Sequence, residues 1–356
     1  MQVPDRVRGQ AALNSMTIHV GLIGGGNISE THARAALAIP DVQVSAIYGS
    51  NPVKITRLCG ECGATPYADF EAFLKHKPMD FVAIGSPSGL HAAQGLAAAK
   101  CGLHVVTEKP LDVSTRQGQE LIAAAKEAGV KLGVFFQDRF KPDIIKVKRW
   151  LDAGVLGKPI LADARVKWFR PPSYYADSRW RGSLALDGGG ALINQAIHTV
   201  DLLLWLFGDV ANVQAQKKTA LHKIEAEDTL VALLEFANGA MGVLQATTSA
   251  YPGYPRRLEL TGTEGTVIID HDKLIAADLR NPPRDLQSAG DDQNPSSNSP
   301  AVTDVRGHRA VLEDFIEAMQ TGRDPRCSGR EGLRSLALVE AIYEACRSGE
   351  RVEVKS

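Results

Sequence analysis

A glycine-rich turn between a short apolar run and a helical pattern is the feature that most constrains this fold. Residues 18–23 are mostly apolar, as in a buried parallel strand, and residues 30–37 have a helical pattern. Between them stands Gly24-x-Gly26-x-x-Ser29. Gly24 permits the tight turn, Gly26 lets the backbone approach a pyrophosphate at the helix N-terminus, and Ser29 is small enough for close packing of helix and strand. The pattern predicts a dinucleotide-binding unit, with a glycine turn of another α/β protein as the alternative.

The order of strands and helices predicts two architectures in sequence. Through Phe140, strands at 18–23, 42–48, 81–84, 104–106 and 131–136 alternate with helices such as 90–100 and 116–128. This alternation predicts a Rossmann fold with a doubly wound parallel sheet. Later strands follow one another, which predicts an α+β domain with a large, mostly antiparallel open sheet. Its expected strands are 160–168, 210–216, 229–236, 240–248, 257–261 and 265–270, and its expected helices are 144–153, 189–206, 307–321 and 329–348.

The predicted domains follow from this change of pattern. We expect a dinucleotide-binding domain at 16–140 and a substrate-binding and oligomerisation domain at 141–356. Residues 1–15 are expected to be a disordered extension, because the first strand begins directly after Met16. Residues 281–304, rich in Pro, Ser, Asp and Asn, are expected to form a mobile loop.

Composition narrows the class of partner and the compartment. With 40 Lys and Arg against 41 Asp and Glu, the chain gives no reason to expect nucleic acid or an acidic membrane surface as a partner. We expect no signal peptide and no membrane span. Five cysteines are an odd number and favour a reducing compartment, so a cytoplasmic protein is expected. Cys59-x-x-Cys62 lacks a second ligand pair, which favours a helix end over a metal or redox site.

Further segments, in order, resemble one protein family. They are the glycine turn with Asn27, Gly85–His91 (GSPSGLH), Glu108–Pro110 (EKP), Gly188–Asp201 (GGGALINQAIHTVD) and a terminal pattern of His308, Asp314-Phe315 and 332–343. Together they resemble the glucose-fructose oxidoreductase/inositol dehydrogenase (Gfo/Idh/MocA) family of nicotinamide-dependent sugar and polyol dehydrogenases. The resemblance runs from about Thr17 to Val354.

The resemblance implies roles for Lys109 and His198. Oxidising a secondary alcohol needs one group to take the hydroxyl proton and another to hold the oxygen while a hydride leaves carbon. By similarity, Lys109 lies between nicotinamide and substrate, and His198 accepts the proton. On the residues alone, Lys109 could be a surface lysine and His198 a packed helix histidine. His308 could enter the pocket or simply be buried at its helix.

One catalytic position departs from the family pattern. Many relatives have aspartate four residues before the histidine, where this chain has Asn194. Asn194 and His198 share a helix face, so both could reach the sugar. Asparagine can orient a hydroxyl but cannot carry a proton. The proton relay would then use His198 and Lys109 alone, or Asp201.

The resemblance also implies a set of cofactor contacts: Gly24, Gly26, Asn27, Ile28, Ser50, Asn51, Lys54, Pro87, His91, Glu108 and Lys109. An acidic residue after the second strand would accept hydrogen bonds from an NAD ribose, and residues 46–54 contain none. Ser50, Asn51 and Lys54 favour NADP, with Arg57 as an additional candidate contact, and NAD is the alternative.

An aromatic and basic loop at 167–181 predicts the substrate class. Its candidate contacts are Trp168, Arg170, Tyr175, Trp180 and Arg181, to which Asp201 is added from the helix. Aromatic faces stack on sugars, and arginine pairs with carboxylate or phosphate, so an acidic or nucleotide-linked sugar is the natural ligand. A subunit interface is the alternative, because Tyr, Trp and Arg are also enriched there. The resemblance implies a homodimer or homotetramer formed through the second-domain sheet.

The expected function is hydride transfer between NAD(P) and a ring secondary alcohol of a sugar, polyol such as inositol, or nucleotide-sugar. Two alternatives stay open. One is a redox-neutral, NAD-dependent glycoside-cleaving enzyme acting through a 3-keto intermediate, and the other is a non-catalytic cofactor-sensing regulator. Retention of both Lys109 and His198 favours an enzyme over the regulator.

Overall fold

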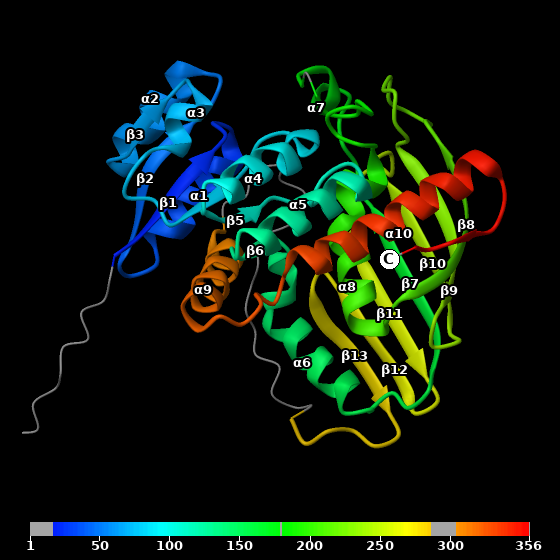
Figure 1. Ribbon diagram of the computed structural model, residues 1–356. Coiled ribbons are helices and arrows are strands. Elements are labelled where there is room, and N and C mark those ends of the chain that lie inside the picture. The colour runs from blue at the N-terminus through cyan, green and yellow to red at the C-terminus, as the bar shows by residue number, and fades with distance from the viewer. Residues whose placement is uncertain (1–16, 179, 286–303, 356) are drawn as a thin grey trace, which may run out of the picture.

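The computed structural model describes residues 17–178, 180–285 and 304–355, which form two sheets with helices packed between and around them (Figure 1). The predicted extension at 1–15 and most of the predicted loop at 281–304 lie outside these described residues.

The first sheet is wholly parallel and has the strand order β3-β2-β1-β4-β5-β6. Its strands are β1 (Ile18–Ile23), β2 (Val42–Tyr48), β3 (Thr65–Tyr67), β4 (Phe81–Ile84), β5 (His104–Thr107) and β6 (Leu132–Val134). The order reverses between β1 and β4, and open α/β sheets bind ligands beyond the carboxyl ends of the strands at such a switch point. The predicted Rossmann fold is confirmed.

Helices bury both faces of this sheet because alternate strand residues point to opposite sides. Val20 and Leu22 of β1 pack with α1 (Asn27–Leu37), α2 (Pro52–Cys62) and α9 (Arg306–Thr321). Ile23 belongs to the other core, under α4 (His91–Lys100) and α5 (Thr115–Glu127). The short helix α3 (Phe70–Leu74) lies on this second side. Helix α9 comes from the C-terminal part of the chain and packs against α1. One face of the first sheet is therefore covered in part by a segment that is distant in the sequence.

The second sheet has eight strands in the order β13-β12-β11-β7-β10-β9-β8-β14. Its strands are β7 (Pro159–Lys167), β8 (Val210–Lys218), β9 (Thr229–Phe236), β10 (Met241–Thr247), β11 (Arg257–Gly262), β12 (Gly265–Asp270), β13 (Lys273–Leu279) and β14 (Val352–Glu353). All neighbours are antiparallel except β7 and β10. This confirms the mostly antiparallel sheet.

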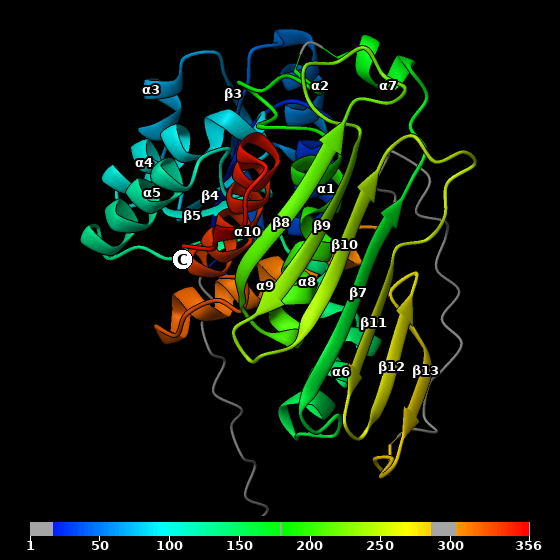
Figure 2. The same ribbon diagram turned by 90° about the vertical axis from the view of Figure 1, so that its right-hand side faces the viewer.

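The second sheet has one covered face and one open face. Helices α6 (Pro142–Asp152), α8 (Ile197–Phe207) and α10 (Gly329–Ser348) pack on one side (Figure 1). Figure 2 shows the other side uncovered. Residues of β9 alternate between buried and exposed, as expected for such a sheet. The edge strands β3, β13 and β14 were not predicted. β3 and β14 have only three and two residues, and β13 has no fully buried residue, so all three leave a weak pattern.

The segment predicted as one helix at 189–206 is two structures. A π-helical turn, Ala191–Ala196, precedes α8. Its first backbone N–H groups are bound by a side chain: Gly190 and Leu192 donate to the buried carboxylate of Glu227 at 3.2 and 2.9 Å. Single π turns inside helices are frequent at functional sites, and this one contains Asn194 and ends two residues before His198.

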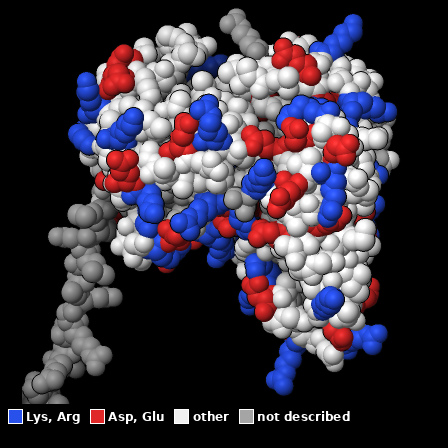
Figure 3. Space-filling view, turned by 45° about the vertical axis from the view of Figure 1, so that its right-hand side comes forward, with Lys and Arg blue, Asp and Glu red and all other residues white. Residues whose placement is uncertain are grey.

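Surface charge is mixed. Lys and Arg are interspersed with Asp and Glu over the face drawn in Figure 3, in line with the net charge of −1. Within the described ranges, no helix combines the length and apolar character needed to cross a membrane.

Candidate active site

Lys109 lies between the first sheet and the π turn that precedes α8. It follows the end of β5, and its ammonium donates to the backbone carbonyl of Asn194, with 3.0 Å between Nζ and O. Burial lowers the Lys109 pKa, while the negative charges of Glu108 and Asp187 oppose that shift. The structure therefore joins the lysine of the EKP segment to the π turn ahead of α8.

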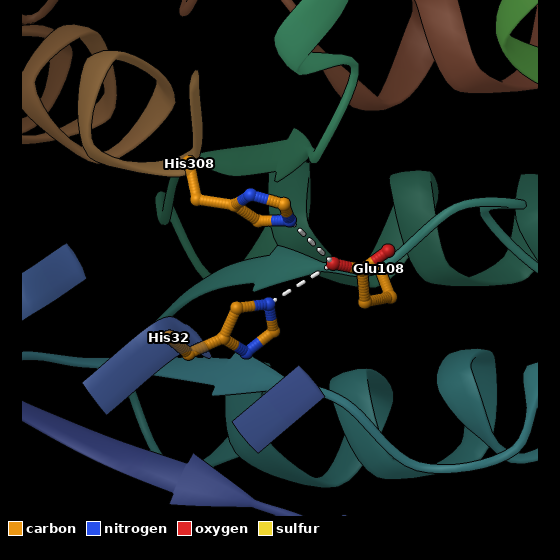
Figure 4. A group of neighbouring side chains, drawn as sticks. All are labelled: His32, Glu108 and His308. Carbon is orange, nitrogen blue, oxygen red and sulfur yellow. Dashed lines mark hydrogen bonds and ion pairs between the residues drawn. The ribbon is translucent and has the colours of Figure 1, made fainter. Parts of the chain in front are cut away.

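Glu108, beside Lys109, is held by two histidines from distant helices (Figure 4). Its Oε1 lies 3.0 Å from His32 Nε2 on α1 and 3.3 Å from His308 Nε2 on α9. Burial alone would raise the pKa of Glu108, but the hydrogen bonds and charges of His308 and His32 lower it well below its usual range. The carboxylate thus anchors the strand end that carries Lys109.

The same three side chains have metal-ligand chemistry, since one donor atom from each lies within 4.8 Å of the others. Histidines that bind zinc almost always donate their other ring N–H to a second partner. The Nδ1 of His32 is buried with no hydrogen-bond partner within the described structure. Burial lowers the His32 pKa, which favours a neutral ring. The cluster therefore fits a hydrogen-bonded anchor for Glu108 better than a metal site.

His198 lies in the first turn of α8 with Nδ1 facing Asp138 of the short helix η2 (Gln137–Phe140) at 3.6 Å. Burial lowers the His198 pKa to about 3, opposed by the negative charge of Asp138. Asp138 is itself paired with Arg256 at 2.7 Å and Lys141 at 2.8 Å. At neutral pH the ring is neutral and has a lone pair available for a proton.

Asn194 is fixed at both ends of its amide. Its Nδ2 donates to the buried carboxylate of Asp187, and its Oδ1 accepts from Gln195 Nε2 at 2.6 Å. Gln195 Oε1 accepts from both Nε and Nη2 of Arg170 at 3.1 and 2.8 Å. The network connects the surroundings of Lys109 to the aromatic and basic loop predicted to contact the substrate.

That loop is packed through its aromatic rings. The Arg170 guanidinium lies 5.1 Å from the Trp168 ring centre, and Arg181 lies 4.2 Å from the ring centre of Tyr174. Trp180 is half-buried, and Arg181 lies 5.7 Å from its ring centre. Tyr175 is buried, with its hydroxyl 3.0 Å from Thr248 Oγ1.

A cavity of about 820 Å³ opens beside this loop, with Tyr175, Arg181, His222 and Lys223 in its lining. Its cationic lining suits an anionic ligand group, although Glu225 also lines it.

Two predicted contact residues have structural partners. Asp201 is buried in a bidentate ion pair with Arg139, at 2.6 and 2.8 Å, which favours a structural role over the predicted substrate contact. His91 is buried between the carbonyl oxygens of Pro110 and Ser86, at 2.8 and 3.0 Å. Its influence on a cofactor would therefore act through the position of Pro110.

The glycine turn fits a dinucleotide pyrophosphate. Gly24 has φ +124°, and a Cβ there would stand 2.8 Å from the Gly85 carbonyl oxygen and from Ser29 Oγ, so only glycine is free of strain. A Cβ on Gly26 would meet nothing within 4 Å, and the N–H groups of Asn27 and Ile28 begin α1. Such N–H groups at a helix N-terminus bind phosphate oxygens.

The remaining cofactor candidates line the same edge of the sheet. Ser50, Asn51 and Lys54 are exposed just after β2, and Asn51 caps α2 by accepting from the Lys54 backbone N–H at 3.1 Å. Pro87 is half-buried after β4. Arg57 is engaged by Glu30 and Glu61, which reduces its availability to a phosphate.

The cysteine pair lies at the end of α2, where Gly63 has φ +71°. Burial raises the pKa of Cys59 to about 11, so its thiolate is disfavoured at neutral pH. The expected helix end is confirmed.

Several site residues carried no recognisable sequence signal. Asp138, Asp187, Gln195 and His32 reach the site only through tertiary contacts. Only Asp138 could have been found from its position in the sequence. It follows the end of β6, and ligands bind beyond the carboxyl ends of the strands in such a sheet.

Comparison with known proteins agrees with this geometry. A model described as an oxidoreductase family with an NAD-binding Rossmann fold matches residues 18–136, and a GFO/IDH/MocA C-terminal domain model matches residues 144–268. The D-apiose dehydrogenase of Paraburkholderia graminis is 28% identical, covering 94% of this chain and 89% of that protein. The inositol 2-dehydrogenase of Rhizobium meliloti is 23% identical, covering 95% of this chain and 100% of that protein.

Solved structures are similar over nearly the whole chain. The WlbA dehydrogenase from Bordetella pertussis, in complex with NADH and UDP-GlcNAcA, is 34% identical with a TM-score of 0.87, covering 96% of this chain and 99% of that one. The Chromobacterium violaceum counterpart, with the same two ligands, is 30% identical with a TM-score of 0.88, covering 96% and 97%. This chain belongs to the GFO/IDH/MocA family of NAD-binding oxidoreductases.

Proposed function

We propose that this chain is a nicotinamide-dependent dehydrogenase that oxidises a ring secondary alcohol of an acidic, nucleotide-linked sugar. The observation that carries the proposal is the Arg170–Gln195–Asn194 connection, which links the aromatic and basic loop to the site of Lys109 and His198. The two WlbA structures, whose complexes contain UDP-GlcNAcA, support this substrate class.

The proposed chemistry assigns one task to each reacting side chain. The nicotinamide, when bound, accepts the hydride. Neutral His198 takes the hydroxyl proton, and the Asp138 carboxylate stabilises the imidazolium that forms. The Lys109 ammonium donates a hydrogen bond to the hydroxyl oxygen. Asn194 orients the sugar without carrying a proton.

The charged part of the substrate is assigned to the arginines of the loop. Arginine binds carboxylate and phosphate with two parallel hydrogen bonds. Arg170 is already engaged by Gln195, so Arg181, which is half-buried and lines the cavity, is the proposed contact. The ring of Trp168 offers a surface for sugar C–H groups.

For the cofactor we keep the preference for NADP over NAD. Ser50, Asn51 and Lys54 are exposed together after β2, and residues 46–54 contain no acidic side chain to repel a 2′-phosphate. The NADH found in both WlbA complexes supports the alternative, which is NAD. Titration of the two reduced cofactors decides, and tighter NADH binding would reverse the preference.

We also propose a cytoplasmic homodimer or homotetramer. The open face of the second sheet exposes apolar side chains, among them Leu161, Leu233 and Met241. Surface of this kind is typical of a subunit interface. The five cysteines are free, as a reducing compartment requires.

The test is absorbance at 340 nm with NAD or NADP and a panel of inositols, aldoses, glycosides, uronates and nucleotide-sugars. We expect turnover of UDP-GlcNAcA, loss of turnover in Lys109→Ala, and a KM at least about tenfold higher in Arg181→Ala. For the same nucleotide-sugar without its carboxylate, the Arg181→Ala effect should be smaller.

Other outcomes separate the alternatives. Turnover confined to neutral sugars would overturn the acidic substrate. Glycoside cleavage without added nucleotide, with cofactor retained through purification, would favour the redox-neutral enzyme. Tight cofactor binding without turnover of any compound in the panel would favour the regulator.

A further inference from the structure

Asp187 is a buried carboxylate at the reaction site that the proposed chemistry does not use. It is 1% exposed and follows segment 180–186, which leads from α7 (Ser173–Ala176) toward the π turn. Its Oδ2 accepts from the Gly182 backbone N–H at 2.8 Å, and its Oδ1 accepts from Asn194 Nδ2. Both oxygens therefore have fixed partners.

The segment that carries Asp187 is tied to the dinucleotide-binding half. Gly89 donates its backbone N–H to the Leu186 carbonyl at 3.0 Å, and a Cβ on Gly89 would stand 2.5 Å from the Ala185 oxygen. A side chain at position 89 would push the segment away. Asp187 therefore lies between the Gly89 segment of the dinucleotide-binding domain and Asn194 of the π turn.

Charged neighbours surround this carboxylate. Lys109 at the end of β5 and Arg181 after α7 are the cations that act on Asp187, and Asp187 in turn acts on the phenol of Tyr175 on α7. Burial raises the Asp187 pKa to about 6, against the hydrogen bonds of Gly182 and Asn194 and these cations. In the other direction, the charges of Glu108 and, after it, Asp187 support the protonated state of Lys109.

We propose that Asp187 is a positioning residue that fixes the amide of Asn194 and keeps Lys109 in its charged form for the reaction. This role rests on the proposed dehydrogenase function. Asn194 carries no charge, and Asp187, which accepts a hydrogen bond from it, supplies the negative charge instead.

A residue exchange tests this assignment. In Asp187→Asn, the amide nitrogen at 187 would face either Asn194 Nδ2 or the Gly182 N–H, donor against donor, unless the amide at 194 turned away from Gln195. In the double variant Asp187→Asn/Asn194→Asp every hydrogen bond can be kept. The amide at 187 accepts from Gly182 and donates to the carboxylate at 194, whose other oxygen accepts from Gln195. Asp177→Asn, an exposed aspartate of the same region, is the control.

We expect Asp187→Asn to lower kcat at least about tenfold. Its pH profile should lose the acid limb near pH 6, and its alkaline limb should move to lower pH. The exchange variant should recover most of the activity and of the alkaline limb, and cofactor binding should be unchanged throughout. An Asp187→Asn variant with the wild-type kcat and pH profile, or an exchange variant no better than the single one, would overturn the proposal.

A second readout needs no substrate. The pH dependence of Lys109 acetylation by acetic anhydride, followed by mass spectrometry, reports the Lys109 pKa directly. We expect a lower pKa in Asp187→Asn and recovery in the exchange variant, and an unchanged pKa would contradict the role. If the wild type oxidises nothing in the panel, the proposed function fails while this readout still decides the role of Asp187.

Discussion

His308 of α9 places its Nε2 3.3 Å from the Oε1 of Glu108, which directly follows β5 and is far from His308 in the sequence. Both are buried, and His32 completes the contact from α1 at 3.0 Å. Helix α9 thereby holds the strand end that carries Lys109.

We expect His308→Ala to destabilise the protein by about 1–3 kcal/mol, because the buried Glu108 carboxylate loses a close polar contact and a cavity remains. Urea unfolding followed by circular dichroism measures this. Arg309→Ala on the same helix removes an exposed ion pair with Glu313 and should cost no more than about 0.5 kcal/mol. Equal effects of the two variants would show that the anchor is unimportant.

Acid should weaken the same contact. The folded-state pKa of Glu108 lies below that of an unfolded glutamate, so the unfolded chain binds the proton first as pH falls. The stabilisation is complete above about pH 4.3 and is lost as pH drops through the folded-state value. We expect unfolding midpoints measured from pH 6 to pH 3 to fall less steeply in Glu108→Gln. An identical slope in the variant and the wild type would refute the assignment.

His198→Ala should reduce kcat by about 10²–10⁴-fold, because the general base is removed, while cofactor binding is retained. Since the His198 pKa is about 3, His198 should add no limb of its own to the wild-type profile near neutral pH, where the limb near pH 6 is assigned to Asp187. Stopped-flow turnover and quenching of cofactor fluorescence measure the two properties. His76→Ala, at the other end of the dinucleotide-binding half, is the control, and an active His198→Ala enzyme would rule out the proposed base.

Lys54→Ala tests the cofactor preference. The exposed ammonium after β2 can pair with a 2′-phosphate but not with a ribose hydroxyl. We expect the Kd for NADPH to rise about three- to tenfold and the Kd for NADH to change less than about twofold. Lys126→Ala, exposed on α5, serves as the control. Equal changes for both cofactors would argue against phosphate recognition by Lys54.

The fold could be predicted because its pattern is local. Apolar runs, the glycine turn and the change from alternating to successive strands gave the two sheets, and β1, β2, β4, β9, β12 and α10 have the predicted bounds. The π turn was not predicted, because it depends on Glu227, which binds its N–H groups from a residue more than thirty positions away. Periodicity within the segment contains no such information.

The candidate site was predicted where residues lie in short segments. Lys109, Asn194 and the glycine turn stand in recognisable patterns, and the contact between Lys109 and Asn194 joins two of them. Asp138 and Asp187 approach their partners only after folding. For Asp201 the sequence pattern pointed elsewhere. Its spacing from His198 suggested that both side chains share a helix face and reach the substrate, but the Asp201 carboxylate is buried and paired with Arg139.

The open face of the second sheet leads to the last prediction. Met241 of β10 pairs with Leu161 of β7, and Val243 pairs with Leu233 of β9. Leu161, Leu233 and Met241 are 48%, 54% and 63% exposed, so this stripe would leave a large apolar surface in water in a monomer. We expect Leu233→Glu to lower the mass measured by light scattering after size-exclusion chromatography, because a buried unpaired carboxylate opposes association. Val53→Glu, placed at an 80% exposed position on α2, should leave the mass unchanged. If Leu233→Glu keeps the wild-type mass, the subunit contact lies elsewhere. The aromatic and basic loop at 167–181 would then be the alternative interface.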